Sequence, residues 1–583
     1  MQKGCGCEVI GSRQKRTRTR KKKRPGRIIL LGIVLVGAGW GAWQFLPNFS
    51  HEEPEWIGQK KPVFIEGQWS GYTARGSGDT LKLPLPLVRE QINAYAYGDP
   101  DGETAILTTP SELLVMTQGD EQARLNGESY ALGSSLEEAD GVLYIPVEPL
   151  EQLYGIQIAE ESPDGSVIVL KAGNEFRTGS ATDGGLFSST KLRSDRTIKA
   201  PAVADLEDGT PLRIWSEQDG WLYAQTDEGR SGYIPADEVK IGGEEKVPVL
   251  EVAETSAAKE WSDKKINLAW EAVYERKPSP DVIEEMQGIN VVSPTWFELK
   301  DSAGNVKSKA DSAYVGRAHN RDKQVWGLFS NSFEADWTRD MLSDYSTRAV
   351  AIRQVLDYAA EYKLDGINLD FENVYTEDKE PFVEFVREFT VQAHQAGLIV
   401  SVDVTPKSNS EMWSAFLDRR ALGETVDFMM VMAYDEHWAS SPNAGSVASL
   451  PWVETSVTRI LEEDNVPASK LVLGIPLYTR VWTETEENGE TKVSSSAIGM
   501  ESSQRLLTEN GAKQELLEDI GQNYAEYEDK EDGTKKRVWL EDGGSLARRI
   551  ELAKKHELAG VASWTRSFAS AEAWKVLRTI NEK

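Results

Sequence analysis

The side chains best suited to chemistry lie in residues 364–373, which read Leu-Asp-Gly-Ile-Asn-Leu-Asp-Phe-Glu-Asn. Within this run the polar residues Asn368, Asp370 and Glu372 are separated by single apolar residues. A period of two predicts a β-strand that presents its polar side chains on one face. Carboxylates two positions apart on a strand are roughly 6–7 Å apart, close enough to change each other's pKa. The pattern favours general acid–base chemistry, and a solvated acidic strand face is the alternative.

This run resembles the pattern D-G-x-D-x-D-x-E of glycoside hydrolase family 18. Asp365, Gly366, Asp370 and Glu372 occupy matching positions. The sequence departs from the pattern at Asn368, where chitinases of the family carry Asp. In this departure the sequence is similar to the bacterial spore and cell-wall branch of the family.

Two later segments carry the same resemblance. Met432-Ala433-Tyr434-Asp435 resembles the family's M-x-Y-D, and Trp564 resembles its tryptophan at the floor of the sugar site. Each segment ends an expected strand of the barrel described below. Because barrel active sites gather at the carboxyl ends of the strands, we expect these residues to converge.

The resemblance implies a role for each of these residues. Glu372 would be the general acid, Asp370 would orient and charge-stabilise the substrate's acetamide, and Tyr434 would donate to the acetamide oxygen. In this family the substrate's own acetamido oxygen acts as the nucleophile. The residues expected to bind substrate are Asn368, Asp435, Met432, Trp564, Asn331, Trp296 and Trp438. For Asn331, Trp296 and Trp438 packing at the barrel rim is the alternative, and no cofactor or metal is expected.

The charge of the chain is divided sharply between its ends. Residues 1–47 hold 11 Lys and Arg against one acid, about +10, whereas the whole chain of 583 residues has a net charge of −29. The remainder is therefore strongly acidic, which argues against nucleic acid as a partner. The length predicts several domains.

The first 46 residues indicate a membrane anchor. A basic tail at residues 1–27 precedes an apolar run at residues 28–46, which is long enough to span a bilayer. The basic flank predicts a cytoplasmic N-terminus, and no cleavage site follows the run. We therefore expect a single-pass protein of the cell membrane with its C-terminal domains outside, at the cell wall. Both cysteines, Cys5 and Cys7, precede the run, so no disulfide is expected beyond it.

Two small domains are expected after the anchor. Residues 64–173 contain short β-type runs separated by turn residues, and they resemble the α+β stalk domain named for the N-terminus of copper amine oxidases. Residues 186–242 resemble an all-β bacterial SH3 domain. Its aromatic residues Trp215, Trp221 and Tyr233 are either core or a groove for wall peptide. A linker is expected at residues 243–263.

The C-terminal segment, residues 264–583, alternates strand-like and helix-like patterns. Strands are expected at residues 266–273, 289–296, 325–330, 366–372, 398–404, 428–434, 471–477 and 560–564. Such alternation predicts a (β/α)8 TIM barrel. Residues 483–542 are too long for one crossover and carry a hairpin pattern, so we expect a small α+β insertion there.

These observations together predict a membrane-anchored glycosidase. The expected substrate is a polysaccharide containing N-acetylglucosamine, cut at its β-1,4 bonds, with peptidoglycan favoured by the SH3-like segment and by Asn368. Chitin-type oligomers are the close alternative, because they carry the same acetamide. A lectin-like protein that binds glycan without cutting it is the third hypothesis, against which the presence of Glu372 argues.

Overall fold

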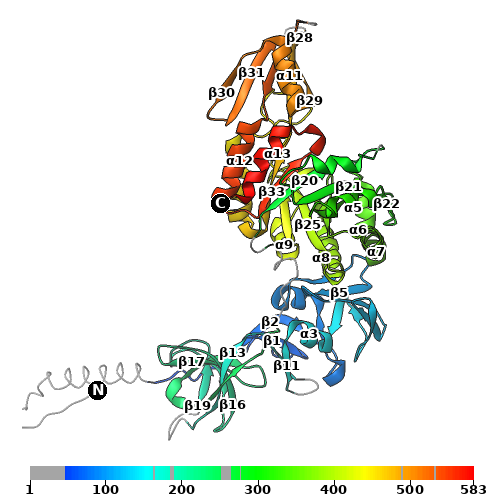
Figure 1. Cartoon of the computed structure of the whole chain (residues 1–583). Coiled ribbons are helices and arrows are strands. Elements are labelled where there is room, and N and C mark those ends of the chain that lie inside the picture. The colour runs from blue at the N-terminus through cyan, green and yellow to red at the C-terminus, as the bar shows by residue number, and fades with distance from the viewer. Residues whose placement is uncertain are drawn as a thin grey trace, which may run out of the picture. The chain divides into compact units, whose positions relative to one another are not determined.

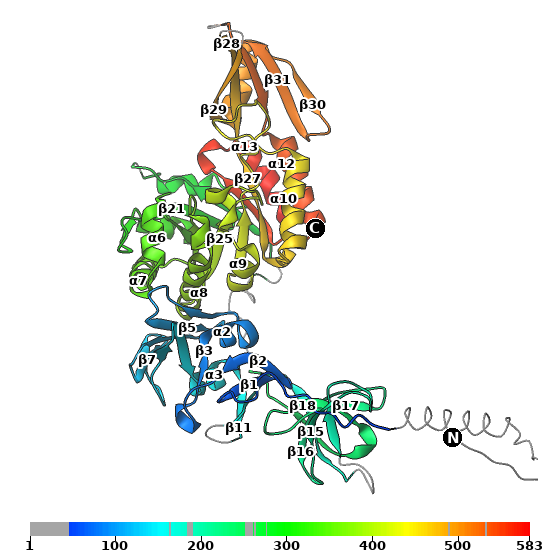
Figure 2. The same ribbon diagram turned by 180° about the vertical axis from the view of Figure 1, so that it is seen from behind.

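The computed structural model describes residues 46–161, 165–183, 190–250, 261, 264–275, 277–487, 490–530 and 533–582. The chain forms two compact units, seen from opposite sides in Figures 1 and 2. The first unit combines Met1–Ile57 with Glu175–Glu245, and the second combines Gly58–Asn174 with Lys246–Lys583.

The second unit contains a closed barrel of eight parallel strands among its described residues. The strands, in order around the barrel, are β20 (Ile266–Glu271), β21 (Val291–Leu299), β23 (Gln324–Ser330), β24 (Gly366–Asp370), β25 (Ile399–Val404), β26 (Phe428–Val431), β27 (Leu471–Pro476) and β33 (Gly560–Trp564). Strand β33 pairs with β20 and so closes the ring. The predicted C-terminal (β/α)8 barrel is confirmed.

Helices cover the outside of this barrel, as Figure 1 shows for α7 and α8 in green and for α12 and α13 in red. Their bounds are α5 (Ser312–His319), α6 (Ala335–Leu342), α7 (Tyr345–Tyr362), α8 (Lys379–Gln395), α9 (Arg419–Thr425), α10 (Leu450–Glu463), α12 (Gly543–Lys555) and α13 (Ala571–Leu577). Helix α7 begins where the Asp344 carboxylate accepts from the Ser346 amide at 2.6 Å, a normal N-cap. Helix α8 buries one side rich in Phe, which packs on the strands.

Large aromatic side chains fill the barrel interior. Trp326 stacks on Phe428 with ring centroids 5.9 Å apart, and both belong to an interior cluster with Trp270. Gly366 makes room for this filling, because a Cβ there would lie 2.9 Å from the Trp326 ring. The glycine of the Asp-Gly pair at the start of β24 is therefore required by packing.

The amino ends of β24 and β26 are fixed by the same arrangement. Asp365 accepts from the amide of Val325 at 2.7 Å and pairs with His319 at 2.9 Å. Asp427 accepts from the amide of Val400 at 2.8 Å and pairs with a histidine of α8 at 2.9 Å. Both carboxylates lie at the amino ends of their strands, opposite the carboxyl ends. Asp365 therefore has a structural role, which is to fix the start of β24.

A five-stranded antiparallel sheet lies between β27 and α12, in the order β29-β28-β32-β31-β30. Its elements are β28 (Tyr478–Glu487), β29 (Glu490–Gly499), α11 (Met500–Asn510), β30 (Gln514–Leu517), β31 (Gln522–Glu528) and β32 (Lys535–Trp539). Figure 2 shows them in orange, with α13 and α12 next to them. Leu507 of α11 packs on Val481, Ala525 and Val538 of the sheet. The strand β28 begins only two residues after β27 ends.

The second unit also contains a smaller α+β part built from residues 58–174. Its strands are β1 (Pro62–Ile65), β2 (Gln68–Thr73), β3 (Lys82–Pro84), β4 (Ala96–Gly98), β5 (Thr104–Thr108), β6 (Leu113–Thr117), β7 (Gln122–Leu125), β8 (Glu128–Ala131), β9 (Glu137–Ala139), β10 (Val142–Pro146), β11 (Gln157–Glu160) and β12 (Val167–Leu170). They form sheets of five, four and three strands around one core with α3 (Val147–Tyr154).

The first unit is a small all-β structure. Its seven-stranded sheet has the order β15-β14-β18-β17-β16-β13-β19. The strands are β13 (Glu175–Ala181), β14 (Lys191–Arg193), β15 (Ala202–Asp205), β16 (Pro211–Gln218), β17 (Trp221–Gln225), β18 (Ser231–Pro235) and β19 (Val239–Lys246). Trp215, Trp221 and Tyr233 are half-buried in it. Most of the expected linker, at residues 251–260 and 262–263, lies outside the described residues.

The expected single-pass localisation in the cell membrane is contradicted. Nowhere in the described part of the chain is a helix both long and apolar enough to cross a bilayer. The longest described helix, α7, has 18 residues but carries Arg348, Arg353, Asp357 and Glu361, and charged groups are costly in a bilayer core. The segment on which the expectation rested, residues 28–46, lies outside the described residues except for Leu46.

A buried ion cluster joins the α+β part of the second unit to the barrel helices. The Arg348 guanidinium of α7 donates to Asp99 at 2.7 Å and to Glu388 of α8 at 2.7 Å. All three side chains have no exposed surface. The other Asp99 oxygen accepts from the Tyr345 amide at 2.7 Å, at the start of α7. Burial raises the pKa of Asp99 and of Glu388, and the Arg348 charge opposes that rise.

Replacing Arg348 with Met should lower the free energy of unfolding by about 3–5 kcal/mol, because two buried carboxyls lose their cation. Denaturant unfolding at neutral pH measures the loss. Arg353→Met, at an exposed site on the same helix, is the control and should change stability by less than about 0.5 kcal/mol. Equal effects of the two variants would contradict the importance of this cluster.

Candidate active site

The strand β24 separates its side chains as its sequence predicted. Ile367 and Leu369 are fully buried in the layer between strands and helices. Phe371, just beyond the strand, lies in the same layer and stacks on Phe382 of α8 with centroids 5.4 Å apart. Asn368 and Asp370 alternate with these residues and so face the barrel interior. Three apolar anchors on one side thus fix the direction of the polar side chains on the other.

Asn331 holds the backbone of Glu372 in place. Its Nδ2 donates to the Glu372 carbonyl at 2.7 Å, and its Oδ1 accepts from the Glu372 amide at 3.1 Å. Nδ2 also donates to the Thr338 hydroxyl at 2.9 Å, and Asn331 is completely buried. The residue expected to line a sugar subsite is therefore placed behind Glu372, where it fixes the main chain that carries the acid.

Asp370 and Glu372 form a pair of half-buried carboxyls. Burial raises the pKa of Asp370 above its ordinary value. Burial also raises the pKa of Glu372 well above its ordinary value, and the charges of Asp370 and Asp435 raise it further. A carboxyl with a raised pKa keeps its proton near neutral pH and is suited to act as a general acid.

Asn368 lies beneath this pair and is fully buried. Its Oδ1 accepts from the Trp270 indole at 2.8 Å and from the Ser293 hydroxyl at 3.2 Å. Its Nδ2 donates to Asp403 at 2.8 Å. These contacts occupy both ends of the amide, so the structure places Asn368 as a support of the site.

Tyr434 and Asp435 follow the end of β26. The Tyr434 ring packs edge-on against Tyr478 with centroids 6.4 Å apart. Burial raises the pKa of Tyr434 well above its ordinary value, and the nearby Asp403, Asp370 and Glu372 charges add to the effect. Tyr434 therefore lies within electrostatic reach of the three acids while it keeps its phenolic proton.

Asp435 connects the barrel to the inserted sheet. It has a left-handed backbone with φ +61°. Its carboxylate accepts from the Tyr478 hydroxyl at 2.6 Å and from Arg480 at 3.1 Å. Both partners belong to β28, the first strand of the insertion. Met432, three residues earlier, is half-buried, and its amide donates to Val404 at 2.8 Å.

The three tryptophans expected to bind substrate lie in different surroundings. Trp564, at the end of β33, is half-buried and packs edge-on against Trp270 with centroids 6.2 Å apart, on the interior side of the barrel. Trp438 is 53% exposed on the loop after β26. Trp296 is fully buried against Tyr314 of α5, in the layer between strands and helices. The structure brings Trp564 to the interior with Asn368 and leaves Trp296 outside it.

Sequence reasoning missed Asp403, the third buried acid of the site. Strand β25 alternates Val400, Val402 and Val404 with Ser401 and Asp403. This is the same alternation that identified β24, so the pattern itself could have found Asp403. Trp270, Tyr478 and Arg480 were missed as well, because their contacts join strands far apart in the sequence.

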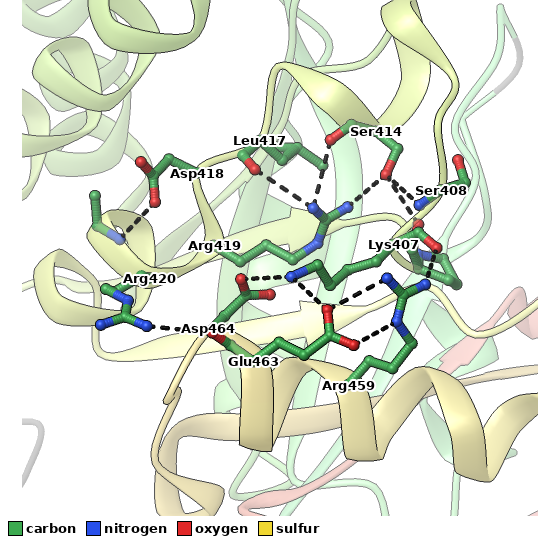
Figure 3. A network of polar contacts seen from close by, with 12 residues as sticks. Lys407, Ser408, Ser414, Leu417, Asp418, Arg419, Arg420, Arg459, Glu463 and Asp464 are labelled. Carbon is green, nitrogen blue, oxygen red and sulfur yellow. Dashed lines mark hydrogen bonds and ion pairs between the residues drawn. The ribbon is translucent and has the colours of Figure 1, made fainter.

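The segment that follows Asp403 is anchored by a polar network, drawn in Figure 3. The Arg419 guanidinium is buried and donates to the Thr405 carbonyl at 2.7 Å and to the Ser414 hydroxyl at 2.9 Å. Lys407 binds Asp464 at 2.8 Å, and its carbonyl accepts from Arg459 of α10 at 3.0 Å. Five residues after Lys407, the Met412 carbonyl accepts from the Val374 amide at 3.0 Å, so the loops after β24 and β25 support each other. In the described residues, no group of three or more His, Cys, Asp and Glu is arranged to hold a metal ion.

Comparisons with known proteins agree with this geometry. Residues 320–569 match the family described as Glycosyl hydrolases family 18. The uncharacterized glycosylase YvbX of Bacillus subtilis (strain 168) is 26% identical over 301 residues, which are 50% of this chain and 84% of that protein. The cortical fragment-lytic enzyme of the same organism is 26% identical over 256 residues, 43% of this chain and 58% of that enzyme.

The fold is also similar to a solved structure, the Bacillus megaterium QM B1551 spore cortex-lytic enzyme SleL. The TM-score is 0.50 at 20% identity, over 58% of this chain and 77% of that one. This likeness concerns the fold alone. The chain therefore carries a glycoside hydrolase family 18 domain, and the domain together with the relatives makes it a glycosidase.

Replacing Asn368 with Asp should move the acidic limb of the rate–pH profile upward. A new negative charge about 6 Å from Asp370, at an effective dielectric constant of about 20, changes its pKa by up to about two units. Glycan cleavage measured against pH for the variant and the wild type tests this. Asn320→Asp adds the same charge at an exposed position after α5 and is the control. A downward shift of the acidic limb in Asn368→Asp would contradict the prediction.

Proposed function

We propose that this protein hydrolyses β-1,4 bonds that follow N-acetylglucosamine in peptidoglycan, with retention and with the substrate's acetamide as nucleophile. The observation that carries the proposal is the half-buried carboxyl pair Asp370 and Glu372, whose pKa values are both raised. Tyr434 lies close enough for its pKa to respond to both. An acid, a carboxylate and a phenol at the carboxyl ends of two barrel strands are the groups this reaction needs.

Glu372 is the general acid in this proposal. Its carboxyl protonates the glycosidic oxygen as the bond to the leaving sugar breaks, and it later takes a proton from water. Burial keeps it protonated near neutral pH. The amide contacts of Asn331 fix its backbone, so the acid is presented at one position.

Asp370 and Tyr434 act on the acetamide of the sugar bound before the broken bond. The Tyr434 hydroxyl donates to the acetamide oxygen, and Asp370 accepts from the acetamide N–H. As that oxygen attacks the anomeric carbon, an oxazolinium ion forms and carries positive charge. An ionised Asp370 stabilises it in surroundings of low polarity, where one charge has a large effect. Water then opens the ring with overall retention.

The names of the relatives favour a cell-wall glycan over chitin. The curated relatives include three cortical fragment-lytic enzymes. Asn368, where chitinases have Asp, points the same way. Because the aligned parts cover about half of this chain, the substrate of the whole protein is part of the proposal.

The exposed Trp438 and the half-buried Trp564 and Met432 are proposed to contact sugars, together with Asp435. Trp564 would give an apolar plane for a pyranose ring.

The residues outside the barrel are proposed to comprise a stalk-like domain at 64–173 and an SH3-like domain at 186–242, both in contact with the wall. The half-buried rings of Trp215, Trp221 and Tyr233 in the first unit support a binding role for the latter.

Replacing Glu372 with Gln should lower cleavage of purified sacculi at least a thousandfold while binding to them is kept, because the acid is lost and the shape is preserved. Release of reducing sugar and mass spectrometry of products from defined muropeptides measure cleavage. Co-sedimentation measures binding. Glu411→Gln, at an exposed acid on the loop after β25, is the matched control and should keep wild-type activity.

The outcomes separate the competing functions. Wild-type protein that binds sacculi without cutting them would favour the lectin-like hypothesis. Cleavage of chitin oligomers with no cleavage of muropeptides would replace peptidoglycan with chitin as the substrate. Cleavage that survives in Glu372→Gln would contradict the assignment of the acid.

A further inference from the structure

Asp403 of β25 is a buried carboxyl at the position next to Asp370. Strands β24 and β25 pair in parallel, with Asn368 opposite Ser401 and Leu369 opposite Val402. The same offset brings Asp370 opposite Asp403. Adjacent strands are about 4.8 Å apart, and both residues alternate with side chains of the outer layer, so both carboxyls point into the barrel. Neither the family pattern nor the proposed mechanism gives Asp403 a role.

A chain of hydrogen bonds that runs from Trp270 through Asn368 fixes the orientation of Asp403. The Trp270 indole can only donate, and it donates to Asn368 Oδ1 at 2.8 Å. The amide of Asn368 must therefore direct its Nδ2 toward Asp403, where it donates to Oδ1 at 2.8 Å. One Asp403 oxygen is occupied by this bond. The carboxyl has no freedom to turn away from Asp370 without breaking it.

Among the described residues, no cation contributes to the pKa shift of Asp370 or of Asp403. The charges of Asp370 and Glu372 raise the pKa of Asp403, the bond from Asn368 lowers it, and the charge of Asp403 raises the pKa of Tyr434. Beyond Asn368, β20 and β21 contribute the neutral Trp270 and Ser293. In this situation two facing carboxyls cannot both ionise, and one must keep a proton.

Solvent contact decides which carboxyl keeps the proton. Asp370 retains some exposure, whereas Asp403 is 3% exposed. A charge therefore costs less at Asp370. Oδ1 of Asp370 is buried and has no hydrogen-bond partner among the described residues. A protonated Asp403 would be the missing donor, because a neutral carboxyl has one O–H to give.

We propose that Asp403 acts as a neutral carboxylic acid whose O–H donates to Asp370, and that it is thereby the positioning residue that keeps Asp370 ionised and oriented beside Glu372. The proposal deepens the proposed function and rests on it for the meaning of that orientation. The proton stays on Asp403 through the reaction, so the only proton exchanged with substrate is that of Glu372.

The titration of the site supports this arrangement. Burial is the main cause that raises the pKa of Asp403 well above its ordinary value, and the charges of Asp370 and Glu372 raise it further. The bond from Asn368 acts in the opposite direction. A buried acid that stays neutral in order to donate is a known way to stabilise a neighbouring charge.

Two variants of Asp403 test the proposal through the rate–pH profile. Asp403→Asn keeps an N–H donor at nearly the same place, and should retain cleavage within about threefold with its acidic limb within about half a pH unit of wild type. Asp403→Leu removes the donor, so kcat should fall about tenfold to a hundredfold with a smaller change in KM. Its acidic limb should move upward, because Asp370 ionises less readily without the bond.

Two results would overturn the proposal. If Asp403 carries the negative charge, Asp403→Asn removes a like charge and its acidic limb moves down by a pH unit or more. If no donor is needed, Asp403→Leu keeps the kcat and the pH profile of Asp403→Asn. Thermal unfolding shows whether the Leu variant is folded; if it is not, the Asn variant and the measurement below decide.

Infrared difference spectroscopy tests the proton directly. The spectrum of wild type minus Asp403→Asn at pH 7 should contain the C=O stretch of a protonated carboxylic acid, and its absence would overturn the proposal. This measurement needs no substrate. A wild type that cuts no glycan but shows the band would refute the proposed function and leave the protonated Asp403 standing, so the two failures are distinguishable.

Discussion

The site depends on one constraint, which is the enclosure of acids whose pKa values are shifted by no cation from the described part of the chain. The strand ends of the barrel direct Asp370, Glu372 and Asp403 into the same interior, where desolvation raises the pKa of each. In water these three acids would all be ionised at neutral pH. Inside the barrel the three acids cannot all be ionised. Some of them therefore keep their protons near the position proposed for the substrate. The closure of β33 onto β20 is therefore part of the chemistry, since an open sheet would admit water and release those protons.

Neutral amides do the positioning in this site, and their neutrality is what makes them suitable. Asn331 holds the main chain of Glu372 on both sides, and Asn368 both accepts from Trp270 and donates to Asp403. A carboxylate at either position could only accept. At position 368 it would also face Asp403 at the 2.8 Å now spanned by a hydrogen bond. Asn368, which departs from the family pattern, is thus the hydrogen-bond donor to Asp403 on the adjacent strand.

The barrel could be predicted from the sequence because the pattern that identifies each strand lies within a few consecutive residues. Each strand is a short run of fixed period, and the alternation in β24 was enough to assign its two faces. The sequence left open on which side a rim residue lies. Trp296, within β21, and Asn331, directly after β23, pack outside the barrel interior, which was the alternative to sugar binding, because a shift of one position exchanges interior for exterior. Asp403 was overlooked although β25 shows the same alternation as β24. The pairing of β13 with β16 and of β28 with β32 joins residues distant in sequence, and periodicity carries no such information.

The inserted sheet takes part in the same electrostatic arrangement. Asp435 is the fourth acid at the barrel mouth, and among these four it is the one that pairs with a described cation, Arg480 of β28, at 3.1 Å. Tyr478 of the same strand donates to it and packs against Tyr434. Since β28 begins two residues after β27, the barrel strand itself sets where this cation stands. In the proposed mechanism four acids thus take four states from their surroundings, with Asp370 ionised, Glu372 poised to give its proton, Asp403 neutral and Asp435 paired.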